Sequence, residues 1–179
     1  MLMEVALATN AAHIIGSDLE DKQVASTEKN TDWLVAQHIL TQKDRERIRT
    51  FTCDVRNIAD HLGSTHIDRV ATEGDLGPPL RGSESQKMLD HNREIIEGLW
   101  RDALRALHPT LNDGALLVVC WPSFKTSHGL ARVKVDDDLN ALGYELVNPL
   151  EGWDETNAPL VYHREGQKIA RRIVILKKR

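Results

Sequence analysis

Short apolar runs alternate with amphipathic stretches along most of this chain. Residues 12–18, 48–54, 67–71 and 115–121 are apolar runs of the length typical of strands, and the first two end in an acid. Residues 21–40, 56–62 and 83–107 have the spacing expected of helices. Strands that alternate with helices in this order predict an α/β fold, a doubly wound sheet with right-handed crossovers.

The second half of the chain carries more detailed signals. A Ser83-x-x-Gln86 capping box predicts the start of the long helix, whose apolar positions are Met88, Ile95, Ile96, Leu99, Ala103 and Leu107. Residues 130–142 predict a further helix that stops at Gly143, and residues 144–147 and 168–176 predict strands. Since no helical pattern separates these two strands, we expect them to pair antiparallel. The nearly continuous apolar run 115–121 predicts a central strand covered on both faces.

Composition narrows the class of protein. A length of 179 residues fits a single domain over residues 1–179. With 41% apolar residues, 28% charged residues and a net charge of -4, the chain is neither a disordered tail nor a strongly basic nucleic-acid binder. Any RNA or DNA contact must therefore use a local patch. No apolar run approaches the roughly 18 residues of a membrane span and no leader pattern opens the chain, so we expect a cytoplasmic protein without a membrane partner.

Cysteine and histidine give no sign of a metal or disulfide framework. Cys53 and Cys120 both lie in strand-like apolar runs, where a thiol usually behaves as a small buried apolar group. The eight histidines form no spaced Cys/His or His-Glu-x-x-His cluster. We therefore assign no metal.

The polar loop at residues 72–82 is the first candidate for chemistry. In open α/β sheets, ligands bind beyond the carboxyl ends of the strands, and this loop follows a predicted buried strand. The alternative is a plain strand-to-helix connection. The predicted sheet would place Asp18, Asp54 and Glu73 along one edge. There, one acid could accept both ribose hydroxyls and the next an adenine amino group. The alternative for Asp18 and Asp54 is helix capping, worth about 1 kcal/mol each.

The C-terminal segment and the tryptophans are open to two interpretations each. The segment carries eight basic or imidazole side chains against one acid, Glu165: His163, Arg164, Lys168, Arg171, Arg172, Lys177, Lys178 and Arg179. They predict either a phosphate-contacting patch or a charged edge strand that resists aggregation. Trp100 fits a helix core face, whereas Trp121 and Trp153 would either line a base pocket or serve packing.

Four groups of residues occur in an order that adds a more specific expectation. They are Ile15-Gly16-Ser17-Asp18 with Asn30 and Trp33-Leu34; Cys53-Asp54-Val55-Arg56; Thr72-Glu73-Gly74-Asp75-Leu76-Gly77-Pro78; and Tyr162-His163-Arg164 with Gln167 and Arg171-Arg172-Ile173. Together they span nearly the whole chain. The ordered set resembles the class I S-adenosylmethionine-dependent methyltransferases, and within them the tRNA guanine N2-methyltransferase-like group.

The resemblance implies a Rossmann-like sheet, mostly parallel with an antiparallel C-terminal strand, and S-adenosylmethionine as cofactor. Asp18 would hold the ribose hydroxyls and Asp54 would reach the adenine amino group. The further implied cofactor-binding residues are Gly16, Val55, which would pack on the adenine ring, and Glu73. Glu73 and Asp75 would be catalytic, and Leu76, Gly77, Pro78, Arg164 and Arg171 would bind the substrate. The implied reaction methylates an exocyclic guanine amine in tRNA or other RNA, which needs mainly positioning and desolvation.

Two departures from the family pattern bear on this expectation. The loop Glu73-Gly74-Asp75-Leu76-Gly77 lacks the two prolines and the aromatic residue of the common family motif. The family's first strand and glycine-rich cofactor loop are also missing, and Met1 to Thr9 looks like the back half of the helix that should follow them. The missing strand would lie at the centre of the sheet, between the strands at residues 14 and 67. Its absence leaves both of these strands without a partner on one side. We expect a truncated start, although a partner chain or direct pairing of the two strands would also satisfy them.

Two other functional classes are weighed against this one. A non-catalytic nucleic-acid-binding or scaffolding module derived from a methyltransferase is the main alternative. A nucleotide-binding oxidoreductase is disfavoured because no G-x-G-x-x-G motif occurs in the chain.

Overall fold

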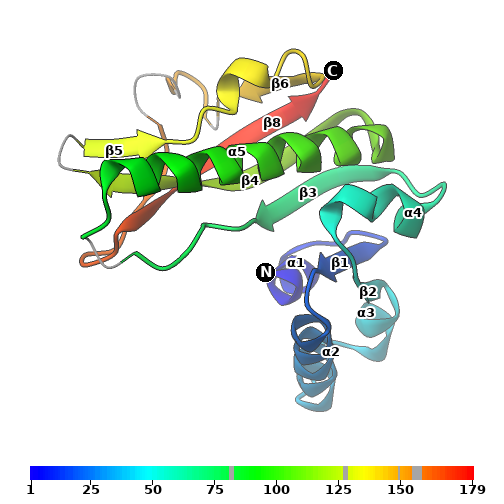
Figure 1. Cartoon of the computed structure of the whole chain (residues 1–179). Helices are drawn as coiled ribbons and strands as arrows, with labels where there is room; N and C mark the ends of the chain where they lie inside the picture. Colours follow the sequence, from blue (N-terminus) through cyan, green and yellow to red (C-terminus); the bar gives the residue numbers. More distant parts are fainter. Residues whose placement is uncertain (81–82, 127–128, 149, 155–158) are drawn as a thin grey trace. The chain divides into compact units, whose positions relative to one another are not determined.

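The computed structural model describes residues 1–80, 83–126, 129–148, 150–154 and 159–179 (Figure 1). The chain divides into two compact units, Met1–Gly63 and Ser64–Arg179, and each is described by itself. None of the described helices is both long and apolar enough to cross a membrane.

The first unit is built on two parallel strands. β1 (Ile14–Asp18) pairs with β2 (Ile48–Thr52), with Ile14 opposite Ile48 and Asp18 opposite Thr52. The helices are α1 (Leu2–Ala8), α2 (Asp21–Ala36), α3 (Gln42–Glu46), the 3-10 turn η1 (Val55–Asn57) and α4 (Ile58–Leu62). The buried cluster consists of Ala6, Ile14, Leu34, Leu40 and Ile48. Each predicted element of this unit is present, and helix α3 is additional.

The second unit contains a six-stranded sheet. Its main path runs β3 (Ile67–Glu73), β4 (Leu111–Thr126), β8 (Ile169–Lys178) and β6 (Tyr144–Val147), while β5 (Gly129–Arg132) pairs with β4 and β7 (Val161–Tyr162) with β8. β3 and β4 are parallel, whereas β8 is antiparallel to β4, β6 and β7. The prediction of an antiparallel C-terminal strand is therefore confirmed. Among the described strands, β1 pairs only with β2 and β3 only with β4, so β1 and β3 each retain an unpaired edge.

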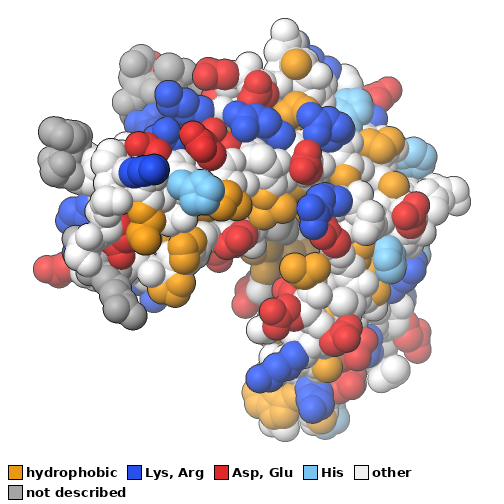
Figure 2. All heavy atoms as spheres, in the orientation of Figure 1, with side chains coloured by type: hydrophobic (Ala, Val, Ile, Leu, Met, Phe, Trp, Pro, Cys, Tyr) orange, Lys and Arg blue, Asp and Glu red, His pale blue; other side chains and the backbone are white. Residues whose placement is uncertain are grey.

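Helix α5 (Gln86–Leu107) lies across one face of this sheet (Figure 1). Its buried apolar side chains are Leu89, Ile96, Trp100, Ala103, Leu104 and Leu107. Trp100 meets Trp121 of β4 edge to face, with ring centroids 6.2 Å apart. The exposed side of the helix carries mixed charges (Figure 2), several of them paired along the helix, such as Arg105 with Asp102.

The predicted start and apolar face of α5 both need correction. Ser85, not Ser83, caps the helix, because its Oγ accepts a hydrogen bond from the backbone N–H of Met88 at 3.3 Å. Met88 and Ile95 are 49% and 56% exposed and lie outside the buried stripe. The neighbouring residues Leu89 and Ile96 are buried instead. Where two apolar residues are adjacent, helical periodicity alone does not decide which one faces the sheet.

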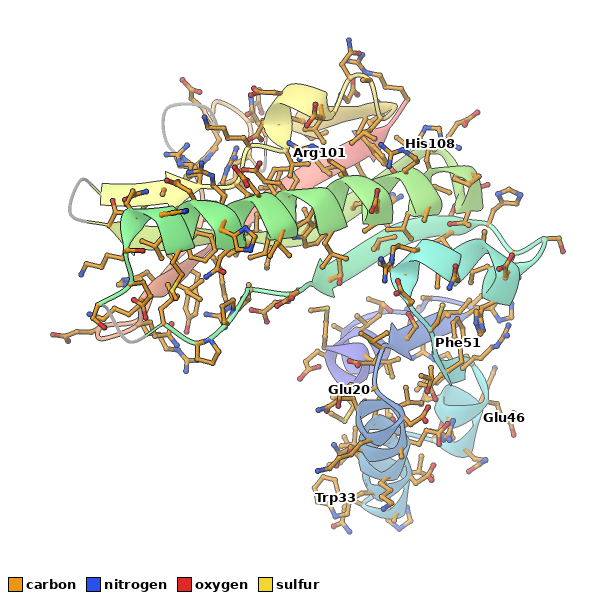
Figure 3. All side chains as sticks on the ribbon, viewed as in Figure 1. Glu20, Trp33, Glu46, Phe51, Arg101 and His108 are labelled. Atoms are coloured by element: carbon orange, nitrogen blue, oxygen red, sulfur yellow. The ribbon has the colours of Figure 1, made fainter. Side chains whose placement is uncertain are left out.

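The helix predicted at residues 130–142 is also wrong. The segment forms β5 and a 3-10 turn, η3 (Asp136–Asp138). Val133 and Val135 are buried on either side of Lys134, whose backbone N–H donates to Glu97 Oε1 of α5 at 2.7 Å. Arg101 reaches from α5 towards the same segment (Figure 3), and its Nε lies 2.5 Å from Asp138 Oδ2. These contacts with α5 favour an extended backbone over local helix propensity.

Strand β4 is central, as predicted, but only one of its faces is well covered. Leu117, Val119 and Trp121 are fully buried on the side of α5. The alternate residues face the other way, and among them Val118 is 38% exposed. The expectation of burial on both faces is therefore wrong for the described residues.

The assignment of the buried face of α5 is testable by truncation. Leu104 is fully buried, so Leu104→Ala should lower the free energy of unfolding of the second unit by about 2–5 kcal/mol. Ile95→Ala, on the exposed side, should change it by less than about 0.5 kcal/mol. Urea unfolding followed by tryptophan fluorescence measures both. A larger loss for Ile95→Ala would contradict the assigned face.

Candidate functional site

In the first unit, two acids lie at one edge of the β1–β2 sheet. Asp18 is the last residue of β1, and Asp54 lies two residues beyond the end of β2. The backbone N–H of Cys53 donates to the carbonyl of Asp18 at 2.9 Å, which extends the pairing up to this edge. The structure therefore brings Asp18 and Asp54 to neighbouring strand ends, as a nucleoside site of the predicted kind requires.

The carboxylate of Asp18 is exposed and only partly engaged. Its Oδ1 accepts a hydrogen bond from the backbone N–H of Glu20 at 2.9 Å, at the entry to α2. Its Oδ2 has no hydrogen-bond partner among the residues that the structure describes. Asp18 can thus support the start of α2 and still accept a hydroxyl hydrogen.

Asp54 is engaged more fully. It caps η1, because its Oδ1 accepts from the backbone N–H of Arg56 at 3.0 Å, and the Arg56 guanidinium lies 2.5 Å from its Oδ2. The hydrogen bonds from the Arg56 side chain, followed by the one from its backbone, lower the pKa of Asp54 to about 2. The capping alternative thus describes its present contacts. Contact of Asp54 with an adenine amino group stays a prediction. It requires the Arg56 side chain to move away from one carboxylate oxygen of Asp54.

The other two predicted cofactor residues of this unit have structural neighbours. Gly16 lies under α1, and a Cβ there would come within 2.2 Å of Leu2 Cδ1. Val55 is half-buried at the first position of η1. A Cβ at this position would therefore require the end of the flexible Leu2 side chain to move.

In the second unit, the loop after β3 rests on α5. A Cβ on Gly74 would lie 2.7 Å from Cζ2 of Trp100, and one on Gly77 would lie 2.9 Å from Cδ1 of Ile96. Gly77 also has a φ of +85°, a conformation that favours glycine. The Asp75 carboxylate accepts from the Gly77 backbone N–H at 2.8 Å. Two glycines and one acid therefore hold this loop against the helix.

Of the remaining loop residues, Leu76 is half-buried and Pro78 is exposed. Arg81 and Gly82, which end the predicted loop, lie outside the described residues.

Glu73, the last residue of β3, forms an ion pair with Arg171 of β8, whose Nε donates to Glu73 Oε1. Both side chains are partly exposed, at 37% and 26%. The predicted catalytic acid and one predicted substrate-binding arginine are therefore in direct contact across β4.

Arg164, another predicted substrate residue, is anchored to Tyr162. The Arg164 Nε donates to the Tyr162 hydroxyl at 2.5 Å, and the guanidinium carbon lies 5.6 Å from the centre of the tyrosine ring. Tyr162 lies opposite Arg171 in the β7–β8 pairing and is 43% exposed. Tyr162 belongs to one of the four groups that carry the family resemblance, but no binding role was predicted for it. The available signal was an aromatic residue followed by His163 and Arg164 in a loop-rich region.

Most cations of the C-terminal segment are paired with acids of the same unit. The pairs are Arg171 with Glu73, Arg172 with Asp136, Lys177 and Arg179 with Glu145, and Lys178 with Asp113. Arg164 and Lys168 form no ion pair within the described part of the chain. The predicted phosphate-contacting patch is therefore narrower than the sequence suggests.

Tryptophan and thiol groups near these residues are structural. Trp121 is fully buried, and the guanidinium of Arg172 lies 5.8 Å from its ring centre, so it does not line an open base pocket. Cys53 and Cys120 are free thiols whose pKa is raised, mainly by burial. No group of three potential ligands among the described residues is placed to hold a metal.

No protein family model and no curated protein sequence matches the chain. Several solved structures share its fold. TrmN from Thermus thermophilus has a TM-score of 0.57 at 16% identity over 99% of this chain and 40% of TrmN. NSun6 from Pyrococcus horikoshii, solved with SFG, has a TM-score of 0.58 at 15% identity over 93% of this chain and 41% of NSun6. A SAM-dependent methyltransferase from Methanosarcina mazei has a TM-score of 0.57 at 11% identity over 98% of this chain and 85% of that protein.

At such identities the similarity establishes the fold alone. The chain has a mixed α/β, Rossmann-like methyltransferase fold, and the predicted fold class is confirmed. The chain spans less than half the length of TrmN and of NSun6.

The Asp54–Arg56 contact predicts an acid-shifted titration. Because folding lowers the pKa of Asp54 to about 2 from an ordinary value of 3.8, the contact favours the folded state above pH 3.8 and is lost as the pH falls towards 2. Arg56→Ala should raise the pKa of Asp54, but not fully, since the backbone hydrogen bond to residue 56 remains. Carboxyl-carbon NMR titration measures the change. Arg45→Ala, which removes the ion pair to Asp32 in the same unit, should leave the pKa of Asp54 unchanged.

Proposed function

We propose that the chain is the methyltransferase domain, or part of one, of an S-adenosylmethionine-dependent enzyme that methylates an exocyclic guanine amine in tRNA or other RNA. The carrying observation is the loop after β3, which is held on α5 and begins with an exposed carboxylate at the carboxyl end of a strand. The similarity of the fold to a SAM-dependent methyltransferase supports the cofactor assignment. Since one fold serves several chemistries, the proposal depends on the site residues.

The first unit supplies the residues proposed to bind S-adenosylmethionine. The Asp18 carboxylate has an oxygen suited to the ribose hydroxyls, and Val55 offers an apolar contact for the adenine ring. Asp54 would accept a hydrogen bond from the adenine amino group through the carboxylate oxygen that Arg56 now contacts. Bound in this way, the cofactor supplies an electrophilic methyl group.

The second unit supplies the residues proposed to present the amine. Arg171 holds Oε1 of Glu73, and Oε2 has no partner among the described residues, so this oxygen can accept a hydrogen bond from the guanine amine. Asp75 keeps the loop in shape through its hydrogen bond to Gly77. The amine loses its proton only as it becomes cationic, so orientation and exclusion of water contribute more than a strong base.

The second candidate function is a non-catalytic nucleic-acid-binding or scaffolding module. One observation favours it. Of the three acids at strand ends, Asp18, Asp54 and Glu73, the last two each form an ion pair with an arginine of their own unit. Such pairs give the acids a structural role that needs no ligand.

Calorimetric titration with S-adenosylhomocysteine separates the two candidates. The wild-type chain should bind, and Asp18→Ala should weaken binding by about tenfold or more, since a hydrogen bond to a charged group is worth about 1.5–3 kcal/mol. Glu73→Ala should weaken this affinity less than Asp18→Ala does and should reduce methyl transfer to guanine in tRNA. Glu20→Ala is the matched control, because Glu20 is an adjacent exposed acid whose side chain makes no capping hydrogen bond.

Absence of S-adenosylhomocysteine binding by the folded wild-type chain would contradict cofactor binding by the residues of this chain and favour the module. Equal loss of cofactor binding and turnover in both acid variants would indicate misfolding, which the unfolding midpoints would reveal.

A further inference from the structure

An exposed aromatic ring lies in line with the candidate amine-presenting acid. Strand register places them on one face: Glu73 lies opposite Cys120, Cys120 opposite Ile173, and Ile173 is two residues from Arg171 on β8. Residues two apart on a strand point to the same side, so Glu73 and Arg171 share a face, as their ion pair requires. Tyr162 lies directly opposite Arg171 on β7. Glu73, Arg171 and Tyr162 therefore form a row across the sheet.

This row lies on the face away from α5. Trp121 and Leu117 are buried on the side of the helix, and Cys120 alternates with them along β4. The opposite face remains accessible in the described structure, with Val118 38% and Tyr162 43% exposed. A planar ligand group can therefore reach the tyrosine ring.

The turn that follows Tyr162 is held by internal hydrogen bonds. The Gln167 backbone N–H donates to the carbonyl of Arg164 at 3.2 Å, and the His163 Nε2 lies 2.9 Å from the carbonyl of Gln167. The Arg164 Nε holds the Tyr162 hydroxyl. A ring whose position is already restrained loses little conformational entropy when a ligand stacks on it.

Cations without an ion pair in the described residues occur in this turn and on the strand backbone next to it. The Arg164 hydrogen bond uses Nε, and its two terminal nitrogens have no hydrogen-bond or ion-pair partner within the described part of the chain. Lys168 forms no ion pair there, and its carbonyl accepts from the backbone N–H of the exposed Lys125 at 2.9 Å. Arg164 therefore lies beside an exposed aromatic ring without an acid partner in the described residues, in a chain whose net charge is -4.

We propose that Tyr162 and Arg164 form a nucleotide subsite for single-stranded RNA, in which a base stacks on the Tyr162 ring and the adjacent phosphate contacts Arg164. The inference rests on the proposed function for its choice of RNA. Aromatic rings bind bases of any sequence through their faces, and arginine and lysine bind the backbone phosphates. The row leads from this subsite through Arg171 to Glu73, so the stacked strand would run towards the amine-presenting loop.

The stacking part is tested with short single-stranded RNAs that carry 2-aminopurine at successive positions. Binding of the wild-type chain should quench the 2-aminopurine fluorescence at one position. Tyr162→Ala should abolish this quenching and weaken RNA binding, measured by fluorescence anisotropy, by about tenfold. Tyr162→Phe keeps the ring and should retain the quenching. Trp33→Ala is the matched control, because Trp33 is a 57% exposed aromatic residue of the first unit, on α2 (Figure 3).

The phosphate part is tested by the salt dependence of RNA binding. Arg164→Gln should lower the slope of log affinity against log salt by about 0.7, the value for one phosphate contact to a single strand. Arg105→Gln removes an exposed α5 arginine that pairs with Asp102 and should leave the slope unchanged.

Unchanged RNA affinity and quenching in Tyr162→Ala would overturn the subsite, as would equal effects of Tyr162→Ala and Trp33→Ala. Titration of the same variants with S-adenosylhomocysteine separates this result from failure of the proposed function. RNA binding through Tyr162 without cofactor binding would support the subsite and contradict the enzyme. Cofactor binding without any effect of Tyr162→Ala on RNA binding would support the enzyme proposal and contradict the subsite.

Discussion

The close approach of Gly74 to the ring of Trp100 is the constraint on which the candidate site of the second unit depends. Trp100 is fixed from the other side by Trp121 of β4, so its position is set by the core and not by the loop. The loop after β3 must then pass where the ring allows, and only a residue without a Cβ fits at position 74. The exposed carboxylate of Glu73 is thereby presented from a rigid layer of helix and sheet.

Ion pairs determine how much positive charge remains for a ligand. The C-terminal segment of this chain contains eight basic or imidazole side chains. The sheet brings acids beside most of its arginines and lysines, namely Asp113, Asp136, Glu145 and Glu73. These acids are distant in sequence, and their pairing follows from strand order, which local patterns do not specify. The charge left near β7 is therefore small and localised. Recognition at this point must combine it with the aromatic ring.

Much of the fold is predictable from the pattern of apolar residues, because buried strands and long amphipathic helices have strong periodicities. The strands at residues 14–18, 48–52 and 67–73 and the helices α2 and α5 follow from this pattern. The predicted helix at residues 130–142 failed because Glu97 of α5 binds the backbone of the extended residue Lys134 and Arg101 binds Asp138 of the 3-10 turn η3. β7 has two residues and no period to detect. Of the candidate site, the acids at strand ends are predictable, whereas the pairing of Glu73 with Arg171 and the position of Tyr162 depend on strand register.

The incompletely covered face of the second unit's sheet has a thermodynamic consequence. Apolar groups that already contact water in the folded state, such as the side chain of Val118, add little newly hydrated surface on unfolding. The heat capacity change of unfolding is proportional to that newly exposed surface. The stability curve of this unit is therefore flatter with temperature than the 41% apolar composition of the whole chain alone would imply. A ligand or partner that covers the face would increase the curvature as well as the maximum stability.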